Sequence, residues 1–171
     1  MDDRMNMRID QVDARGRAIG TVKRGEVFDT GANFRVVHVL LFNARRELLL
    51  QQVSSRRARH PGYWGSSVAG YLLSGETYLQ AARRKLRTEL GIEDVVLKSV
   101  GRTTMIDQGC KKFIGVFEAT YTGPLSPNPE DFAALWFVPR AEVWRLIKQG
   151  ALPFTPTFEH VFDFWKRHAT S

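Results

Sequence analysis

The sequence predicts a single α+β domain in which a mixed β-sheet lies between helices. Two observations favour this class. Short runs rich in β-branched and aromatic residues recur with turn residues between them, as in paired strands. Segments with apolar residues at spacings of three and four, typical of amphipathic helices, lie between these runs and after them. At 171 residues, without repeats, low-complexity tracts or linkers, the chain suits one domain over 1–171.

The expected elements follow one another along the chain. Residues 1–8 are expected to be a loose leader, followed by a hairpin around the turn at 13–16. Residues 34–42 are almost wholly apolar, which predicts a central strand, and 47–53 is its expected partner. The polar, basic segment 54–62 is expected to be a loop. The remaining expected elements are strands at 63–69, 95–104, 113–121 and 134–138, and helices at 77–91, at 139–148 and from 155 onward.

The composition narrows the classes of partner. The formal net charge is +7 and the pI is near 9.9, which favours anionic partners, either phosphorylated small molecules or nucleic acid. No apolar run reaches the roughly 18 residues that a membrane helix needs, and the start has no signal-peptide pattern, so we expect a cytoplasmic protein without membrane contact. The single Cys110 excludes an intrachain disulfide and is expected to be a half-buried structural thiol.

The helix expected at 77–91 has recognisable signals at both ends. Thr77 and Gln80 form a capping-box pattern, and Gly91 supplies the left-handed residue at which helices end. Its spacing predicts one buried stripe and one outward face. The stripe is expected to contain Leu79, Ala82, Leu86 and Leu90, and the outward face Ala81, Arg84, Lys85 and Thr88, flanked by Glu89.

The loop and helix together resemble the Nudix box, G-x5-E-x7-R-E-U-x-E-E-x-G-U, where U is aliphatic. The matching positions are Gly70, Glu76, Arg84, Leu86, Glu89, Gly91 and Ile92. The resemblance implies the Nudix fold. It also implies a face that holds Mg²⁺ against a diphosphate through three helix glutamates. In this chain Lys85 and Thr88 replace two of those glutamates, so the face is expected to hold an anion instead. Alternatively, Lys85 and Glu89 simply pair with each other as i, i+4 neighbours.

Most of the chain further resembles isopentenyl-diphosphate isomerase-like Nudix proteins. The segments that carry this resemblance are 18–21, 40–43, 61–64, 67–70 and 154–156. The catalytic equipment of that branch is absent. Its cysteine position is Ala69, its histidine positions are Tyr71 and Phe34, its paired glutamates should fall near 110–112, and its aromatic position is Thr157. Because alanine carries no exchangeable proton and phenylalanine cannot ligate a metal, isomerase activity by the family route is not expected.

The same resemblance implies a set of site residues. The expected diphosphate-binding residues are Lys23, Arg57, Tyr71, Arg84 and Lys85. Glu89 is expected to hold Mg²⁺ weakly, with substrate oxygens as further ligands of the ion. Glu76 is expected to contact these ligands rather than the ion itself. Glu130, or its neighbour Asp131, is the candidate general base. His38, within an apolar strand, is expected to be a structural histidine.

These residues leave more than one function open. The first is a Nudix-type hydrolase that binds a diphosphate-containing small molecule with Mg²⁺ and hydrolyses the diphosphate linkage. The second is a non-catalytic module for a phosphorylated ligand, a partner or RNA, with Tyr63, Trp64 and Tyr71 as stacking residues beside the arginines of 56–59. The sequence fits a monomer or a homodimer and does not identify the substrate.

Overall fold

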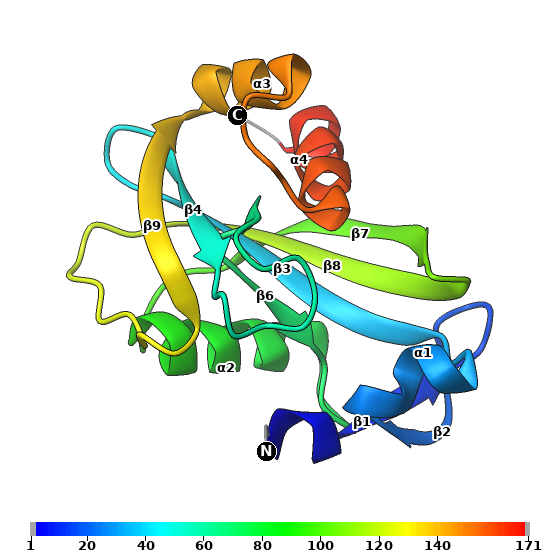
Figure 1. Cartoon of the computed structure of the whole chain (residues 1–171). Coiled ribbons are helices and arrows are strands. Elements are labelled where there is room, and N and C mark those ends of the chain that lie inside the picture. Colours follow the sequence, from blue (N-terminus) through cyan, green and yellow to red (C-terminus); the bar gives the residue numbers. More distant parts are fainter. Residues whose placement is uncertain (1–2, 170–171) are drawn as a thin grey trace.

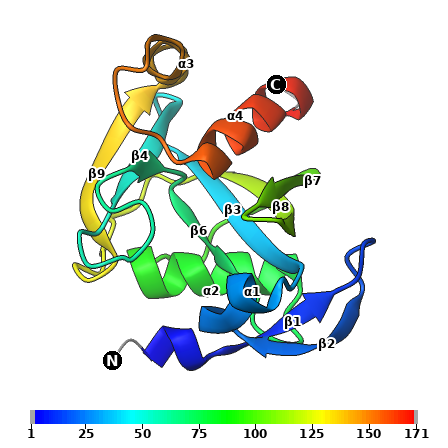
Figure 2. The ribbon, with the colours of Figure 1, turned by 45° about the vertical axis from the view of Figure 1, so that its right-hand side comes forward.

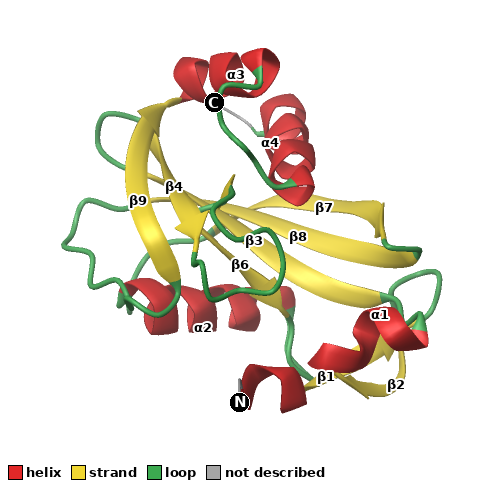
Figure 3. Cartoon of the chain, in the orientation of Figure 1, coloured by secondary structure: helices red, strands yellow, loops and turns green. Residues whose placement is uncertain are grey.

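A mixed seven-stranded sheet separates two layers of helices (Figure 1 and Figure 3). The computed structural model describes residues 3–169. The strands are β1 (Arg8–Val12), β2 (Ala18–Lys23), β3 (Phe34–Phe42), β4 (Glu47–Val53), β5 (Trp64–Gly65), β6 (Val68–Tyr71), β7 (Lys98–Asp107), β8 (Cys110–Thr120) and β9 (Phe132–Pro139). The α-helices are α1 (Val27–Thr30), α2 (Tyr78–Leu90), α3 (Arg140–Gln149) and α4 (Pro156–His168). Short 3₁₀ turns occur at Asp3–Asn6 and Arg24–Glu26.

The central strand is β3, as its apolar run predicts. It pairs in parallel with β8, from Phe34↔Lys112 to Phe42↔Thr120, and antiparallel with β6 and with the start of β4. β4 continues the sheet through β9 and β5, and β7 forms the edge beyond β8. The hairpin β1–β2 forms a separate two-stranded sheet. The mixed α+β class expected from the sequence is therefore confirmed.

Both faces of β3 are buried because helices cover the sheet on both sides. One core cluster contains Phe34, Val36, Leu40 and Phe42 and packs against α3 and α4. The other contains Val37, Val39 and Leu41 and packs against α2. Figure 2 shows α2 on the side of the sheet opposite α3 and α4, with the β1–β2 hairpin beside its N-terminal end.

Several local expectations were wrong at the level of single elements. Leu79 is 42% exposed rather than buried, whereas Ala81 is fully buried. The expected strand at 63–69 is two short strands, β5 and β6, and the four-residue helix α1 was not expected. The expected loose leader contains a 3₁₀ turn at Asp3–Asn6, while residues 1–2 of it lie outside the described residues. Cys110 is buried, and its thiol lies 3.8 Å from the carbonyl oxygen of Val27.

Candidate functional site

The helix α2 presents Lys85 and Glu89 to strand β6 rather than to open solvent. Its start is fixed by the expected capping box, in which the Thr77 hydroxyl accepts from the Gln80 N–H and the Gln80 amide oxygen accepts from the Thr77 N–H. The helix ends at Gly91, which has a φ of 69°. Lys85 and Glu89 are only 9% and 6% exposed, and Lys85 Nζ lies 2.5 Å from Glu89 Oε1. The i, i+4 pair therefore forms, but it is buried.

Gly70 makes this burial possible. A Cβ atom at Gly70 would lie 2.7 Å from Cε and 3.0 Å from Nζ of Lys85, closer than packed atoms tolerate. The lysine side chain thus lies directly against the backbone of β6. A side chain at Gly70 would force the end of the Lys85 side chain to move.

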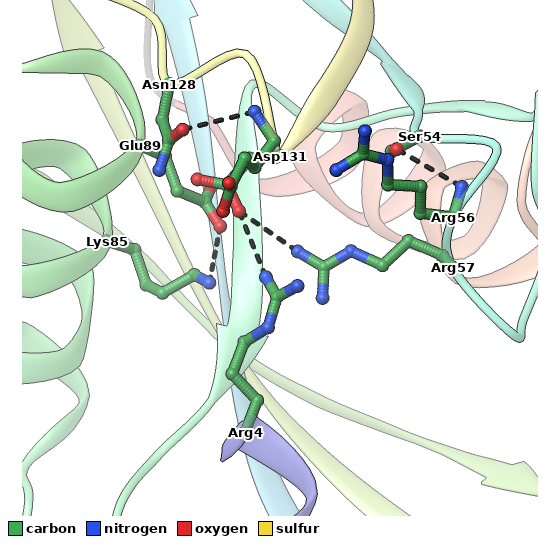
Figure 4. Close-up of polar contacts among 9 residues, drawn as sticks. Arg4, Ser54, Arg56, Arg57, Lys85, Glu89, Asn128 and Asp131 are labelled. Atoms are coloured by element: carbon green, nitrogen blue, oxygen red, sulfur yellow. Dashed lines mark hydrogen bonds and ion pairs between the residues drawn. The ribbon is translucent and has the colours of Figure 1, made fainter. Parts of the chain in front are cut away.

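Asp131 brings two arginines to the same place (Figure 4). Its Oδ1 accepts from Arg57, at 3.1 Å, and from Arg4, at 3.0 Å. Arg57 comes from the loop between β4 and β5, and Arg4 comes from the first 3₁₀ turn. The loop before β9 is attached to the end of α2, because the Asn128 N–H donates to the carbonyl oxygen of Glu89, at 2.8 Å. This attachment places Asp131 beside Glu89.

Burial and neighbouring charges set the ionisation of Glu89. Burial raises its pKa above the ordinary value, and the charge of Asp131 acts in the same direction. The positive charges of Lys85 and Arg57 oppose this shift without cancelling it. Glu89 is therefore a carboxylate whose charged form depends on adjacent cations.

These residues line one hollow with two adjoining lobes. The volumes of the lobes are about 530 Å³ and about 790 Å³. Both lobes are lined by Arg24, Arg56, Tyr71, Lys85, Glu89 and Asp131. Arg57, Arg59, Phe28 and Met5 line the smaller lobe alone, and Arg4, Arg84 and Glu130 the larger one. The smaller lobe has five cationic residues and two carboxylates, so it is suited to an anion.

The structure places the expected ligand-binding residues unequally. Arg57, Tyr71 and Lys85 line the hollow together. Lys23 ends β2 and lines neither lobe, whereas its neighbour Arg24 lines both, with its guanidinium 4.7 Å from the centre of the Tyr71 ring. The expectation for Lys23 depended on a sequence alignment across a region where gaps are uncertain. A shift of one residue in that alignment moves the charged side chain to the opposite side of the strand.

Arg84 and Glu76 are engaged with each other. Arg84 donates to both carboxylate oxygens of Glu76, at 2.8 and 2.9 Å, and also to the carbonyl oxygen of Tyr71, at 3.0 Å. The Leu73 N–H donates to Glu76 at 2.7 Å. Burial alone would raise the pKa of Glu76, but the bonds from Arg84 and Leu73 lower it overall. This network attaches the box loop to α2, although Arg84 also lines the larger lobe.

A second polar network occupies the positions of the missing isomerase residues. Lys112 Nζ lies 2.8 Å from Asp107 and 2.6 Å from the Thr157 hydroxyl, and Arg59 binds both oxygens of Asp107. Ala69 lines the smaller lobe, and Phe34 stacks on Tyr71 with ring centres 5.1 Å apart. The position of the paired glutamates thus holds Lys112, and the aromatic position holds Thr157. The two histidine positions hold the rings of Tyr71 and Phe34.

His38 is a structural residue, as its strand position suggests. It is buried, and its Nδ1 lies 2.8 Å from the Ser66 hydroxyl. Burial, together with the positive charges of Lys112 and His160, lowers its pKa to about 3.

The carboxylates fit poorly to a Mg²⁺ ion held by the protein alone. Within residues 3–169 no group of three or more histidine, cysteine, aspartate or glutamate side chains could hold a metal ion. Glu89 is paired with Lys85, and Asp131 with Arg4 and Arg57. Mg²⁺ prefers several oxygen ligands, and here two carboxylates already have cationic partners.

The comparison with known proteins identifies the family. The family model described as NUDIX domain matches residues 32–158. The chain belongs to the Nudix family. It is 34% identical over 145 residues to an uncharacterized Nudix hydrolase of Pseudomonas aeruginosa, covering 85% of each protein. It is also 29% identical over 162 residues to the isopentenyl-diphosphate Delta-isomerase of Streptomyces avermitilis, covering 91% of this chain and 81% of that one. The resemblance to both branches is confirmed.

Solved structures support the Nudix fold of this chain. A crystal structure from Deinococcus radiodurans matches with a TM-score of 0.79 at 24% identity, over 95% of this chain and 99% of that one. The NUDIX domain of Shewanella oneidensis NrtR, solved with ADP ribose, matches with a TM-score of 0.63 at 16% identity, over 81% and 90%. In the part of this Nudix chain that the structure describes, no helix is both long and apolar enough to cross a membrane.

Two residues of the hollow, Arg4 and Arg24, were not expected from the sequence, whereas Arg56 was expected within the basic segment 54–62. Arg4 lies in a segment without a structural pattern, and Arg24 differs from other basic residues only in where the fold places it. The single usable signal was the excess of basic residues, which predicts an anionic partner but not which side chains converge.

Proposed function

We propose that this Nudix protein binds a diphosphate-containing small molecule in the two-lobed hollow and hydrolyses its diphosphate linkage. The observation that carries the proposal is the convergence of Arg57, Lys85, Glu89 and Asp131 on one cavity from three separate segments. The diphosphate is proposed to lie between Arg57 and Lys85. Guanidinium and ammonium groups form charge-assisted hydrogen bonds to phosphate oxygens, and a desolvated cavity strengthens them.

The ion pairs in the hollow are proposed to exchange partners when the ligand enters. Lys85 and Arg57 each bind a carboxylate in the free protein, at 2.5 and 3.1 Å. A diphosphate offers the same cations more oxygens and more charge. Arg4 and Arg24 are close enough to the same surface to add to the binding.

Mg²⁺ is proposed to arrive chelated by the diphosphate, as part of the substrate. Because Glu89 and Asp131 do not form a metal site by themselves, the ion would depend on phosphate oxygens and water for most of its ligands. The carboxylate of Glu89 is the one that the family resemblance assigns to the metal.

Glu130 is proposed as the general base that takes a proton from the attacking water. Its side chain is exposed, lines the larger lobe and forms no ion pair with another described residue. Asp131 is less suited because two arginines bind it. A base must be free to accept a proton within reach of the water.

The remainder of the substrate is proposed to occupy the apolar part of the smaller lobe. Phe28, Met5 and Val53 line it, and Gln51 adds a buried amide oxygen that accepts no hydrogen bond from any described residue. A substrate donor at this point would satisfy that oxygen. The Tyr71 ring also lines this lobe, with Phe34 stacked on it and the Arg24 guanidinium 4.7 Å from its centre, so a planar group would stack there in place of Arg24.

Turnover of a panel of nucleotide, isoprenoid and sugar diphosphates with Mg²⁺ tests the proposal. Release of phosphate or a monophosphate product is expected from at least one member, with a loss of roughly 100-fold in Arg57→Ala and Glu130→Gln. Glu89→Gln is expected to lose the Mg²⁺-dependent turnover. Arg145→Ala, on an exposed turn of α3, is the matched control and should retain full activity. No turnover of any substrate contradicts the hydrolytic part.

A non-catalytic phosphate-binding module is the second candidate function. The buried Lys85–Glu89 pair favours it, because the pair places a cation where the hydrolases of the family place a metal-binding glutamate. It predicts Mg²⁺-independent binding of pyrophosphate without turnover. The RNA version has less support, since Trp64 packs against the core and against Trp136. RNA binding would weaken linearly on a log–log plot against salt, and a flat response excludes it.

A further inference from the structure

We propose a second ligand site between α3 and α4, which takes a nucleoside monophosphate. A hollow of about 330 Å³ lies there and shares no lining residue with the two-lobed cavity. Figure 1 shows α3 and α4 on the face of the sheet opposite α2. The hollow is lined by Arg46, Glu118, Arg140, Ala141, Trp144, Phe162, Trp165, Lys166 and Ala169. Its volume is at the lower end of the range for small-molecule pockets.

The aromatic walls of this hollow are held in place. Trp165 donates from Nε1 to Glu118 Oε2 at 2.6 Å and stacks on Phe162 with ring centres 5.6 Å apart. It is only 5% exposed, so its orientation is set by the core. Trp144, on α3, supplies a second indole that is half-buried. Lys166 lies over the Trp144 ring, 3.1 Å from its centre, and Arg140 lies 5.9 Å from the centre of Trp165, so a planar base would stack on Trp144 in place of the Lys166 ammonium group.

Three cations from three different elements surround these rings. Arg46 comes from the turn between β3 and β4, Arg140 from the start of α3 and Lys166 from α4. None of the three forms an ion pair with a carboxylate among residues 3–169. Glu118, the one carboxylate in the lining, already binds Trp165 and lies 3.7 Å from Lys98. The positive charge is therefore available for an anionic ligand.

The local backbone adds to this preference for an anion. Helix α3 begins at Arg140 after Pro139, which has no side-chain acceptor for the first N–H groups. Those groups, beside Arg140 and Ala141 at the hollow, add to the positive potential for a phosphate.

Phosphate accounts for these features better than a carboxylate does. Two guanidinium groups can each form two hydrogen bonds to a phosphate dianion, and Lys166 adds a third charge. The Nζ atoms of Lys166 and Lys148 lie 3.1 Å and 4.9 Å from the centre of the Trp144 ring. Of these two lysines, Lys166 lines the hollow and Lys148 does not. Covering an indole with an ammonium group therefore does not by itself create the site, and Lys148 is a matched control.

Calorimetric and tryptophan-fluorescence titrations with AMP, GMP, CMP and UMP test the proposal. Saturable binding of at least one nucleotide, with quenching of tryptophan emission, is expected. Arg140→Ala and Arg46→Ala should each weaken binding about tenfold, and Trp144→Leu should remove most of the quenching. Lys148→Ala should bind as the parent does. The two arginines are exposed, so unchanged circular dichroism is expected of both variants.

A second set of variants separates this site from the diphosphate cavity. Arg57→Ala should leave nucleoside monophosphate binding intact, and Arg140→Ala should leave pyrophosphate binding intact. Absence of saturable binding by all four nucleotides at millimolar concentration overturns the proposal. So does binding that Arg57→Ala abolishes and Arg140→Ala leaves unchanged, because the nucleotide would then occupy the other cavity. Neither result would affect the proposed hydrolysis of a diphosphate.

Discussion

Lys85 and Glu89 make the free energy of unfolding sensitive to a single charge. In Lys85→Met the Glu89 carboxylate stays buried without its partner, so the free energy of unfolding is expected to fall by about 3 kcal/mol at pH 8. The pKa of Glu89 is already raised by burial and would rise further. A raised native pKa gives stability at low pH that is lost as the pH rises through that pKa. Urea unfolding should therefore show a smaller loss at pH 5 than at pH 8.

The double variant Lys85→Met/Glu89→Leu is the control for that prediction. It removes both charges, so most of the loss at pH 8 should be recovered. Equal losses at the two pH values in the single variant would show that lost packing, rather than an unpartnered carboxylate, sets the effect.

His38 gives a second pH dependence, of opposite sign. Its native pKa is about 3, against 6.5 for a free histidine, so the unfolded chain binds a proton that the native one does not. This contribution is fully present above pH 6.5 and falls by about 3 kcal/mol between pH 7 and pH 4. In His38→Gln, the pH dependence of the unfolding free energy over this range should be correspondingly flatter.

Residue types alone predicted part of the site. The replacement of box glutamates by Lys85 and Thr88 indicated a cationic site, and Lys85 and Arg57 do line one cavity. The burial of Lys85 was not predictable, because it depends on the absence of a side chain at Gly70 across from it. A helix period predicts which residues share a face, and it does not show what packs against that face.

At the scale of elements, the capping box of α2 is expected to contribute directly to stability. Thr77→Ala removes the acceptor for the Gln80 N–H and should lower the unfolding free energy by about 1 kcal/mol. Thr88→Ala makes the same chemical change at an exposed position inside the same helix, where alanine is the better helix former. It should be neutral or slightly stabilising in thermal unfolding. Equal effects at both positions would argue against the cap.

The long elements were predictable because their patterns are strong. The apolar run of β3, the caps of α2 and the proline before α3 all identified elements that the structure contains. The errors lie where a pattern is short or ambiguous. Helix α1 has only four residues. In α2 the buried face is wider than the expected stripe, because it includes Tyr78, Ala81 and Lys85 besides Ala82, Leu86 and Leu90, and Leu79 lies outside it.

At the scale of the molecule, two hollows with mainly basic linings share no residue and lie at different parts of the sheet. Helix α2, with Lys85 and Glu89 of the two-lobed hollow, lies on one face of the sheet. Helices α3 and α4, with the hollow between them, lie on the other face. Arg4, Arg57 and Asp131 meet only because the first turn, the loop after β4 and the loop before β9 come together at the end of α2. Such convergence depends on topology, which local sequence patterns do not specify.

Ligand binding should therefore be visible as a change in the stability of the whole chain. Pyrophosphate at a concentration 100 times its Kd is expected to add about 2.7 kcal/mol to the unfolding free energy, because it binds the native cavity and not the unfolded chain. For a chain of this size, that raises the Tm by on the order of 5–10 °C. Differential scanning calorimetry with and without pyrophosphate, at constant ionic strength, measures the shift. The shift should persist in Arg145→Ala and nearly vanish in Arg57→Ala, because Arg57 lines the cavity and Arg145 does not. An equal shift in both variants would mean that net charge, rather than the converging side chains, holds the anion.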